Sequence, residues 1–215
     1  NMKNVLFYGD SNTWGYMPVT GLRYPYEQRW TSIAAKLLGE DYHCVASGLS
    51  GRTTVFDDMW KDGRNGRDGL DQELQTHKPL DLAVIMLGTN DLKFADACRS
   101  ARGIETLLMM TKNANARFSM VSPVFPGKAE ILLISPILVG DNYENYEERE
   151  VSPNGREESK RFASLYRAAA ERCGAHFLDA AELAEPSPED CEHLTVEGHR
   201  VLGEAVAAKI KEILG

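Results

Sequence analysis

A serine near one end of the chain and an aspartate–histidine pair near the other have the residue types that nucleophilic catalysis requires. Ser11 follows a short apolar segment, and His193 follows Asp190 by three positions. A serine hydroxyl becomes a nucleophile when a base takes its proton, and the base needs an anion that fixes its tautomer and stabilises its positive form. In one helical turn, Asp190 and His193 would point to the same side. The pattern therefore predicts a serine hydrolase in which His193 is the base and Asp190 orients it.

Two further positions are suited to stabilise negative charge on a carbonyl oxygen. Asn90 directly follows an apolar segment in the sequence GTND, where its amide can donate a hydrogen bond to an oxyanion. Gly51 offers a backbone N–H that no side chain obstructs. Each position also has a structural alternative: Ser11 as a helix N-cap, Asn90 as a turn residue, and Gly51 as a loop glycine, with Gly48 competing for its role.

Neighbouring residues give further, weaker signals. Asp10 adjoins the serine and is predicted either to brace the turn or to contact substrate, together with Trp14. Exposed aromatic side chains could stack on sugar rings, line a pocket for aryl esters or form a subunit interface; the candidates are Trp14, Tyr16, Trp60 and Tyr143. Four histidines remain, of which only His199 is near enough to His193 to make a secondary contact; the others are His43, His77 and His176.

The cysteines give no sign of a disulfide or a metal site. They are scattered without a CxxC motif, which predicts reduced thiols; the positions are Cys44, Cys98, Cys173 and Cys191. Cys191 lies between Asp190 and His193, so it could instead be a nucleophile or, beside Asp190, His193 and His199, a metal ligand. No further Cys/His cluster completes a four-ligand set, and we expect neither a metal nor an organic cofactor.

Composition and charge restrict the class of protein. The chain has 215 residues, of which 43% are hydrophobic and 26% charged, values typical of one globular domain. Its net charge of -8 disfavours nucleic acid or an anionic membrane as a partner. No apolar run approaches the roughly 18–20 residues that span a bilayer. We expect one domain over residues 2–215, no signal peptide, and a cytoplasmic location.

The elements that must position these residues alternate along the chain. Apolar runs predict strands at residues 3–9, 42–46, 80–87, 130–135 and 175–178. Helical spacing is found at residues 30–38, 70–77, 101–117, 157–172 and 196–214. Residues 57–69 and 140–156 are polar, and the second segment is a candidate contact loop or lid, with an ordinary solvated surface loop as the alternative. Strands alternating with helices predict an α/β fold, a three-layer αβα sandwich of flavodoxin-like type with about five parallel strands.

In such a sheet, ligands bind beyond the carboxyl ends of the strands. Ser11, Gly51 and Asn90 each follow the end of a predicted strand, and Asp190 and His193 follow the last one. The topology therefore predicts that all of the chemically suggestive residues meet at one edge of the sheet.

Four ordered sequence blocks resemble those of the SGNH (GDSL) hydrolase superfamily and span nearly the whole chain. The blocks are GDS at residues 9–11, GLSGRTT at 48–54, GTND at 88–91 and DxxH at 190–193. The segments FYGDSNTWGY and IMLGTND further resemble the bacterial arylesterase/acyltransferase branch. The resemblance implies Ser11 as nucleophile, His193 as base and Asp190 as its orienter. It also implies an oxyanion hole formed by the N–H groups of Ser11 and Gly51 and the Asn90 side chain.

The chain departs from this branch at two places. Gly51 replaces an alanine, which leaves the N–H donor intact, and Cys191-Glu192 replaces a small apolar pair. The expected function is hydrolysis or transfer of short acyl groups from small esters through an acyl-serine intermediate, by a homo-oligomer. The alternatives are a carbohydrate O-acetyl esterase, a lysophospholipase-like lipase, or a non-catalytic flavodoxin-like binding module.

Overall fold

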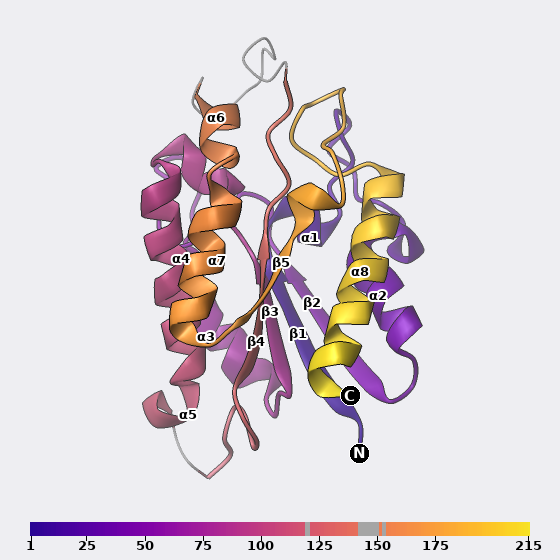
Figure 1. The fold of residues 1–215 in the computed structure, drawn as a ribbon, viewed down its shortest axis with the longest axis vertical. Coiled ribbons are helices and arrows are strands. Elements are labelled where there is room, and N and C mark those ends of the chain that lie inside the picture. The colour runs from indigo at the N-terminus through magenta and orange to yellow at the C-terminus, as the bar shows by residue number, and fades with distance from the viewer. Residues whose placement is uncertain (119–120, 142–150, 152–153) are drawn as a thin grey trace.

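The protein is a parallel sheet between two layers of helices (Figure 1). The computed structural model describes residues 1–118, 121–141, 151 and 154–215. The 5-stranded sheet has the order β2-β1-β3-β4-β5, and every pair of neighbours is parallel. The strands are β1 (Lys3–Gly9), β2 (Tyr42–Gly48), β3 (Leu82–Met86), β4 (Glu130–Ser135) and β5 (His176–Asp179). The predicted flavodoxin-like αβα sandwich is confirmed.

Helices cover both faces of the sheet. One face carries α3 (Gly66–His77), α4 (Ala97–Lys112) and α7 (Phe162–Cys173), whereas α2 (Trp30–Leu38) and α8 (Val196–Leu214) pack together on the other (Figure 1). Shorter helices are α1 (Ser11–Trp14), α5 (Ala114–Arg117) and α6 (Gly155–Ser159). In the described part of the chain, 3₁₀ segments lie at Tyr26–Gln28, Thr89–Lys93 and Ala180–Glu182.

The alternation of side chains along β1 explains why the sheet has two apolar faces. Leu6 and Tyr8 belong to the core beneath α3, α4 and α7, while Val5 and Phe7 belong to the core beneath α2 and α8. Successive strand residues point to opposite faces, so a strand that is apolar throughout must be covered on both sides. All four side chains are buried, and the strand is therefore held in a fixed register.

Two predicted helix starts are wrong by about one turn, because a capping side chain precedes the apolar pattern. The helix predicted from residue 70 begins at Gly66, where the Asn65 side chain accepts a hydrogen bond from the Arg67 N–H. The helix predicted from residue 101 begins at Ala97, after the Asp96 cap. Polar residues in the first turn of a helix weaken the apolar periodicity but satisfy its free N–H groups.

Two predicted helices are each divided in the structure. The helix predicted at residues 101–117 ends at Lys112 and resumes as α5, and the one predicted at residues 157–172 comprises α6 and α7. Residues 142–150 and 152–153, which make up most of the predicted contact loop, lie outside the described residues. Within the described part of the chain, no helix is both long and apolar enough to cross a bilayer.

The register of the central strands sets the position of the functional edge. Gly9, at the end of β1, pairs with Gly48 of β2 on one side and with Met86 of β3 on the other. The strands run away from the N-terminus, so their carboxyl ends lie together at the end of the molecule where α1 is found (Figure 1). The segments that follow β1, β2 and β3 therefore begin side by side.

Candidate functional site

Ser11, His193 and Asp190 form one hydrogen-bonded chain. Ser11 Oγ lies 3.0 Å from His193 Nε2, and His193 Nδ1 lies 2.7 Å from Asp190 Oδ2. Ser11 is the first residue of α1, directly after β1, and the other two residues lie in the loop between β5 and α8. All three side chains are buried, but Ser11 and His193 each retain 8% exposure. The arrangement can transfer the serine proton to the imidazole while the carboxylate holds the opposite ring nitrogen.

The electrostatics of this pair favour an imidazolium beside a carboxylate. Burial alone lowers the pKa of His193, but the hydrogen bond that its imidazole donates to Asp190 and the charges of Glu192, Asp190 and Asp10 outweigh burial and raise that pKa. Burial alone raises the pKa of Asp190, but its hydrogen bonds and the His193 charge outweigh burial and lower the pKa. The surroundings of His193 therefore stabilise its protonated form.

The segment that carries Asp190 and His193 is a tight turn and not the helical turn assumed from their spacing. Asp190 Oδ1 accepts hydrogen bonds from the N–H groups of both Glu192 and His193, each at 3.0 Å. Cys191 has the left-handed backbone value φ 59, which a continuous helix does not contain. The carboxylate thus folds the turn with one oxygen and meets the imidazole with the other.

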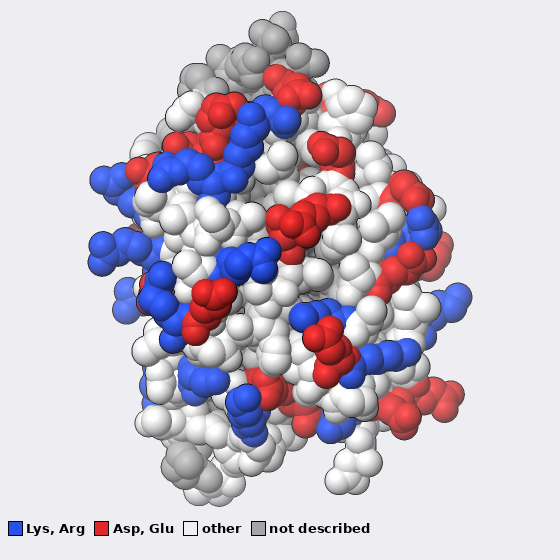
Figure 2. All heavy atoms as spheres, in the orientation of Figure 1, with Lys and Arg blue, Asp and Glu red and all other residues white. Residues whose placement is uncertain are grey.

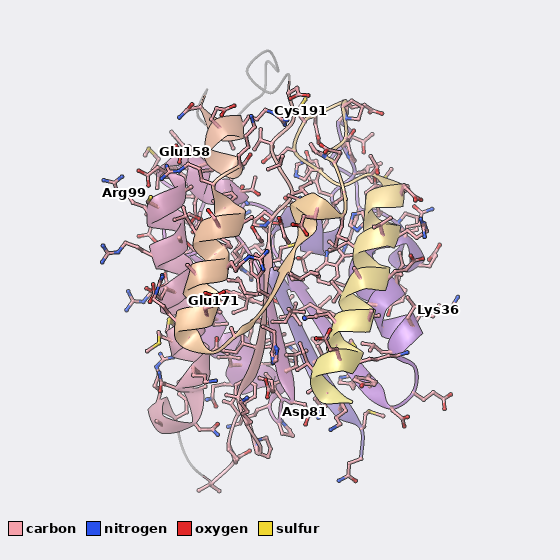
Figure 3. The ribbon with its side chains drawn as sticks, in the orientation of Figure 1. Lys36, Asp81, Arg99, Glu158, Glu171 and Cys191 are labelled. Atoms are coloured by element: carbon pink, nitrogen blue, oxygen red, sulfur yellow. The ribbon has the colours of Figure 1, made fainter. Side chains whose placement is uncertain are left out.

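Cys191 stabilises this turn through contacts with neighbouring segments. It lies at one end of the molecule, in the loop before α8 (Figure 3). Its carbonyl accepts from the Gly140 N–H at 2.7 Å, and its buried thiol donates to the Pro188 carbonyl at 3.8 Å. A Cβ atom on Gly140 would lie 2.7 Å from that of Cys191, so a glycine is needed at that contact. The described residues contain no group of three or more His, Cys, Asp or Glu side chains able to hold a metal ion.

Asn12 joins the two ends of the chain at the site, a role that no local sequence pattern indicates. Its side-chain oxygen accepts from the Leu194 N–H at 3.0 Å, and its Nδ2 donates to the Glu192 carbonyl at 3.4 Å. Its own carbonyl accepts from the Trp30 indole N–H at 3.0 Å. Asn12 therefore fixes the loop that carries His193 against the helix that carries Ser11.

Asn90 and Gly51 lie in the segments after β3 and β2, and they line the same pocket as Ser11. Asn90 is buried, and its Nδ2 donates to the Arg52 carbonyl at 3.2 Å. Gly51 has φ 85, a left-handed conformation that glycine adopts without strain, and it lines the pocket. Gly48 does not line the pocket; a Cβ there would lie 2.2 Å from the Trp14 N, so this glycine permits α1 to pack on β2.

A buried carboxylate connects the Asn90 segment to the loop that contains Gly51. Asp91 accepts hydrogen bonds from the Thr54 N–H at 2.8 Å, the Thr54 hydroxyl at 2.5 Å and the Ser100 hydroxyl at 2.7 Å. Burial raises the pKa of Asp91 to about 6, against the lowering effect of these hydrogen bonds. The Asp91 side chain is fully buried, so it acts as a brace beneath the two oxyanion candidates.

The other residues singled out in the sequence lie beside the pocket or beneath it. Asp10 is buried, caps α1 by accepting from the Asn12 N–H, and does not line the pocket; burial raises its pKa to about 6. Trp14 does not line the pocket either, and the Arg23 guanidinium lies 5.0 Å from its ring centroid. His199 is fully buried; its Nδ1 accepts from the Trp30 N–H, and burial lowers its pKa to about 4.

A polar pocket of about 200 Å³ opens above Ser11. It is lined by all of the predicted catalytic and oxyanion residues. The remaining lining residues are Tyr16, Ser50, Lys61, Arg64, Lys93 and Glu192. The Tyr16 ring stacks on the His193 imidazole, with centroids 4.2 Å apart.

The fold matches that of known esterases. The chain is 34% identical to Est24, a carbohydrate acetylesterase from Sinorhizobium meliloti, and the match covers 99% of this chain and 100% of that one at a TM-score of 0.89. The M. smegmatis aryl esterase is 31% identical, with the same coverage and TM-score. A second carbohydrate acetylesterase family member from Sinorhizobium meliloti is 36% identical over 100% of both chains, with a TM-score of 0.87.

No curated protein sequence matches the chain significantly. The family profile described as GDSL-like Lipase/Acylhydrolase matches residues 7–201, which include every residue of the hydrogen-bonded chain and both oxyanion candidates. The chain belongs to the GDSL-like lipase/acylhydrolase family.

Proposed function

We propose that Ser11 is the nucleophile of a carboxylic ester hydrolase, with His193 as its base and Asp190 as the residue that orients the base. The observation that carries this assignment is the hydrogen-bonded chain from Ser11 Oγ through both nitrogens of His193 to Asp190, which ends at an open pocket. Esterases of similar fold and sequence support the same reaction class. A non-catalytic binding module would give no role to the Asp190–His193 pair.

The geometry supports a two-step acyl transfer. His193 Nε2 takes the Ser11 proton as Oγ bonds to the acyl carbon, and the carbonyl electron pair moves onto oxygen. The tetrahedral intermediate then expels the alcohol, which leaves with the proton held by His193. Water, or a second alcohol, attacks the acyl-serine in the same way and releases Ser11.

Three donors are proposed to hold the oxyanion: the backbone N–H groups of Ser11 and Gly51, and the Asn90 amide. Asn90 donates one N–H to the Arg52 carbonyl, and a primary amide has a second N–H to offer. The fixed carbonyl contact orients the amide, so the free N–H can meet the developing charge without reorganising. Asp10 and Trp14 were expected to contact substrate; in this scheme Asp10 is proposed to support the Ser11 turn.

Short acyl groups fit this site best. The pocket is small and polar, so long apolar chains would gain little by entering it. Acetyl esters of aryl alcohols are the main proposal. Acetylated carbohydrates are the second candidate, because two structures similar to this chain are described as carbohydrate acetylesterases.

Two measurements test the nucleophile. A fluorophosphonate probe should label Ser11, and the Ser11→Ala variant should lose both labelling and turnover of p-nitrophenyl acetate while keeping its circular dichroism spectrum. Cys191→Ala, which removes a thiol two residues from His193, is the control and should retain labelling. Near-normal turnover by folded Ser11→Ala would refute the assignment.

We also infer that the protein assembles with further copies of itself. Met59 and Trp60 are each 73% exposed and directly precede the pocket residue Lys61. Burial of such side chains against a second copy would remove apolar surface from water beside the pocket. The cytoplasmic location expected from the sequence remains a prediction.

A further inference from the structure

The pocket above Ser11 contains more positive charge than the protein as a whole. Lys61, Arg64 and Lys93 line it, whereas the chain has a net charge of -8. On the face shown in Figure 2, acidic and basic side chains are interspersed over the surface. Two carboxylates, Asp190 and Glu192, also line the pocket. The Asp190 carboxylate is hydrogen-bonded to His193. The cationic side of the pocket is thus a local feature.

Backbone hydrogen bonds at Arg64 and Gly66 fix the position of Arg64 relative to the loop after β2. The Thr53 N–H donates to the Arg64 carbonyl at 2.8 Å, and the Gly66 N–H donates back to the Thr53 carbonyl at 3.1 Å. These two bonds join the segment before α3 to the loop after β2. The Arg64 side chain therefore starts from a fixed point beside the Gly51 loop.

The Arg64 guanidinium is oriented by neutral groups. Its Nε donates to the Ser50 carbonyl at 3.2 Å, and its Nη1 donates to the Asp62 carbonyl at 2.6 Å. Among the described residues, no carboxylate forms an ion pair with Arg64. The carbonyls occupy only part of the donor set of a guanidinium, so further N–H groups remain for a ligand.

The stem of Arg64 lies directly against Gly51. A Cβ built on Gly51 would be 3.2 Å from Arg64 Cγ, so the arginine chain covers the face of this glycine. Gly51 is a proposed oxyanion donor, and a substrate carbonyl bound there would lie next to the arginine. A charged group a few bonds from the ester carbonyl would then be within reach of the guanidinium.

We propose that Arg64 binds a carboxylate on the substrate, so that the preferred esters of this enzyme are anionic. The inference rests on the proposed esterase function and names the substrate class for that site. A guanidinium binds carboxylates through paired charge-assisted hydrogen bonds, which are stronger in a partly dehydrated pocket. Lys61 and Lys93 line the same pocket and add positive charge to it, which favours the approach of an anionic substrate.

Matched pairs of esters test this inference. For a carboxylate on the leaving alcohol, the pair is 4-acetoxybenzoate and methyl 4-acetoxybenzoate; for a carboxylate on the acyl group, it is 4-nitrophenyl succinate and its methyl ester. For each pair, kcat/KM for the anionic ester is divided by kcat/KM for the neutral ester, in the wild type and in Arg64→Gln. We expect the ratio to fall about tenfold or more in one of the pairs, the size of one charge-assisted hydrogen bond. The pair that responds shows where on the substrate the carboxylate lies.

Three controls make the result specific to the arginine charge. Arg67→Gln removes the same charge from an exposed position on α3 outside the pocket and should leave both ratios unchanged. Arg64→Lys keeps the charge and should retain part of the preference. In the wild type, added salt should lower kcat/KM for the responding anionic ester more than for its neutral partner.

Unchanged ratios in both pairs would overturn the proposal. So would an equal loss for anionic and neutral esters in Arg64→Gln, because Arg64 would then only brace the Gly51 loop. The failure of the esterase proposal would look different: no ester of either charge would be turned over, and no fluorophosphonate would label the wild type.

Discussion

The ring of Tyr16 lies face to face with the imidazole of His193, at a centroid distance of 4.2 Å and an interplanar angle of 25°. Tyr16 follows the short helix that begins with Ser11, so the same segment supplies the proposed nucleophile and a wall against its base. The stack restricts rotation of the imidazole, while Asp190 fixes the direction of Nδ1.

Removal of this stack should slow catalysis without abolishing it. An aromatic pair contributes about 0.5–1.5 kcal/mol beyond its buried area, so Tyr16→Leu should lower kcat/KM about two- to tenfold. Tyr16→Phe keeps the ring and should retain most of the rate. If Phe and Leu variants lose the same activity, the hydroxyl and not the ring is responsible.

The pH dependence of kcat/KM should follow the ionisation of His193. The base must be neutral to accept the Ser11 proton, so the rate should rise with pH as the imidazole loses its own proton. Because the hydrogen bond and charge of Asp190 outweigh burial and raise the pKa of His193, the midpoint should lie above the ordinary value of about 6.5. Asp190→Asn removes the charge and should move the midpoint of the residual activity downward. A profile that stays flat through the imidazole range would remove His193 from its role.

Loss of the Asn90 amide should act mainly on kcat. A single oxyanion donor contributes about 10²–10³ in rate, and Asn90→Ala should reduce kcat by this factor with little change in KM. Asn113→Ala, at the exposed end of α4, is the matched control and should leave kcat unchanged. An effect below about threefold would make Asn90 a turn residue, which was its structural alternative in the sequence.

The brace formed by Asp91 should contribute to both stability and rate. Asp91→Asn replaces an acceptor oxygen by an N–H₂ group that faces donors on Thr54 or Ser100, and a buried donor left unpaired costs about 1–3 kcal/mol. Urea denaturation should show this loss in the free energy of unfolding, and kcat should fall because the Asn90 and Gly51 segments lose their link. Asp71→Asn, which breaks an exposed ion pair with Arg117, should cost less than about 1 kcal/mol. Equal losses in the two variants would contradict the bracing role.

Acyl-chain preference and mass test the substrate and assembly proposals together. From p-nitrophenyl acetate to octanoate, kcat/KM should decrease, because a longer chain places apolar methylenes against the polar and cationic lining of the pocket. Light scattering should give a multiple of the 23.9 kDa chain mass. A monomer that prefers octanoate would instead favour the lysophospholipase-like alternative.

The fold could be predicted because the strands are apolar on both faces, as Val5 and Leu6 of β1 illustrate. The convergence of Ser11, Asn90 and His193 could be predicted from the same topology, since parallel strands end at one edge. The contacts of Asn12 could not be predicted, because its partner Leu194 is 182 residues away and no local sequence pattern encodes that hydrogen bond. The left-handed backbone conformation at Cys191 could not be predicted from the sequence either, because residues other than glycine rarely adopt it.

The bond between Asn12 and Leu194 has a consequence for how activity arises during folding. A chain interrupted before residue 190 contains Ser11 and every strand of the sheet but lacks His193, the proposed base. In the proposed mechanism the Ser11 hydroxyl therefore stays inert throughout synthesis of the sheet, and it should become nucleophilic only when the last loop docks. We expect contacts between residues this far apart in the sequence to form late, because closing the long loop between them costs chain entropy. Covalent labelling of Ser11 would thus report completion of the native state, and its time course during refolding should lag behind the recovery of secondary structure.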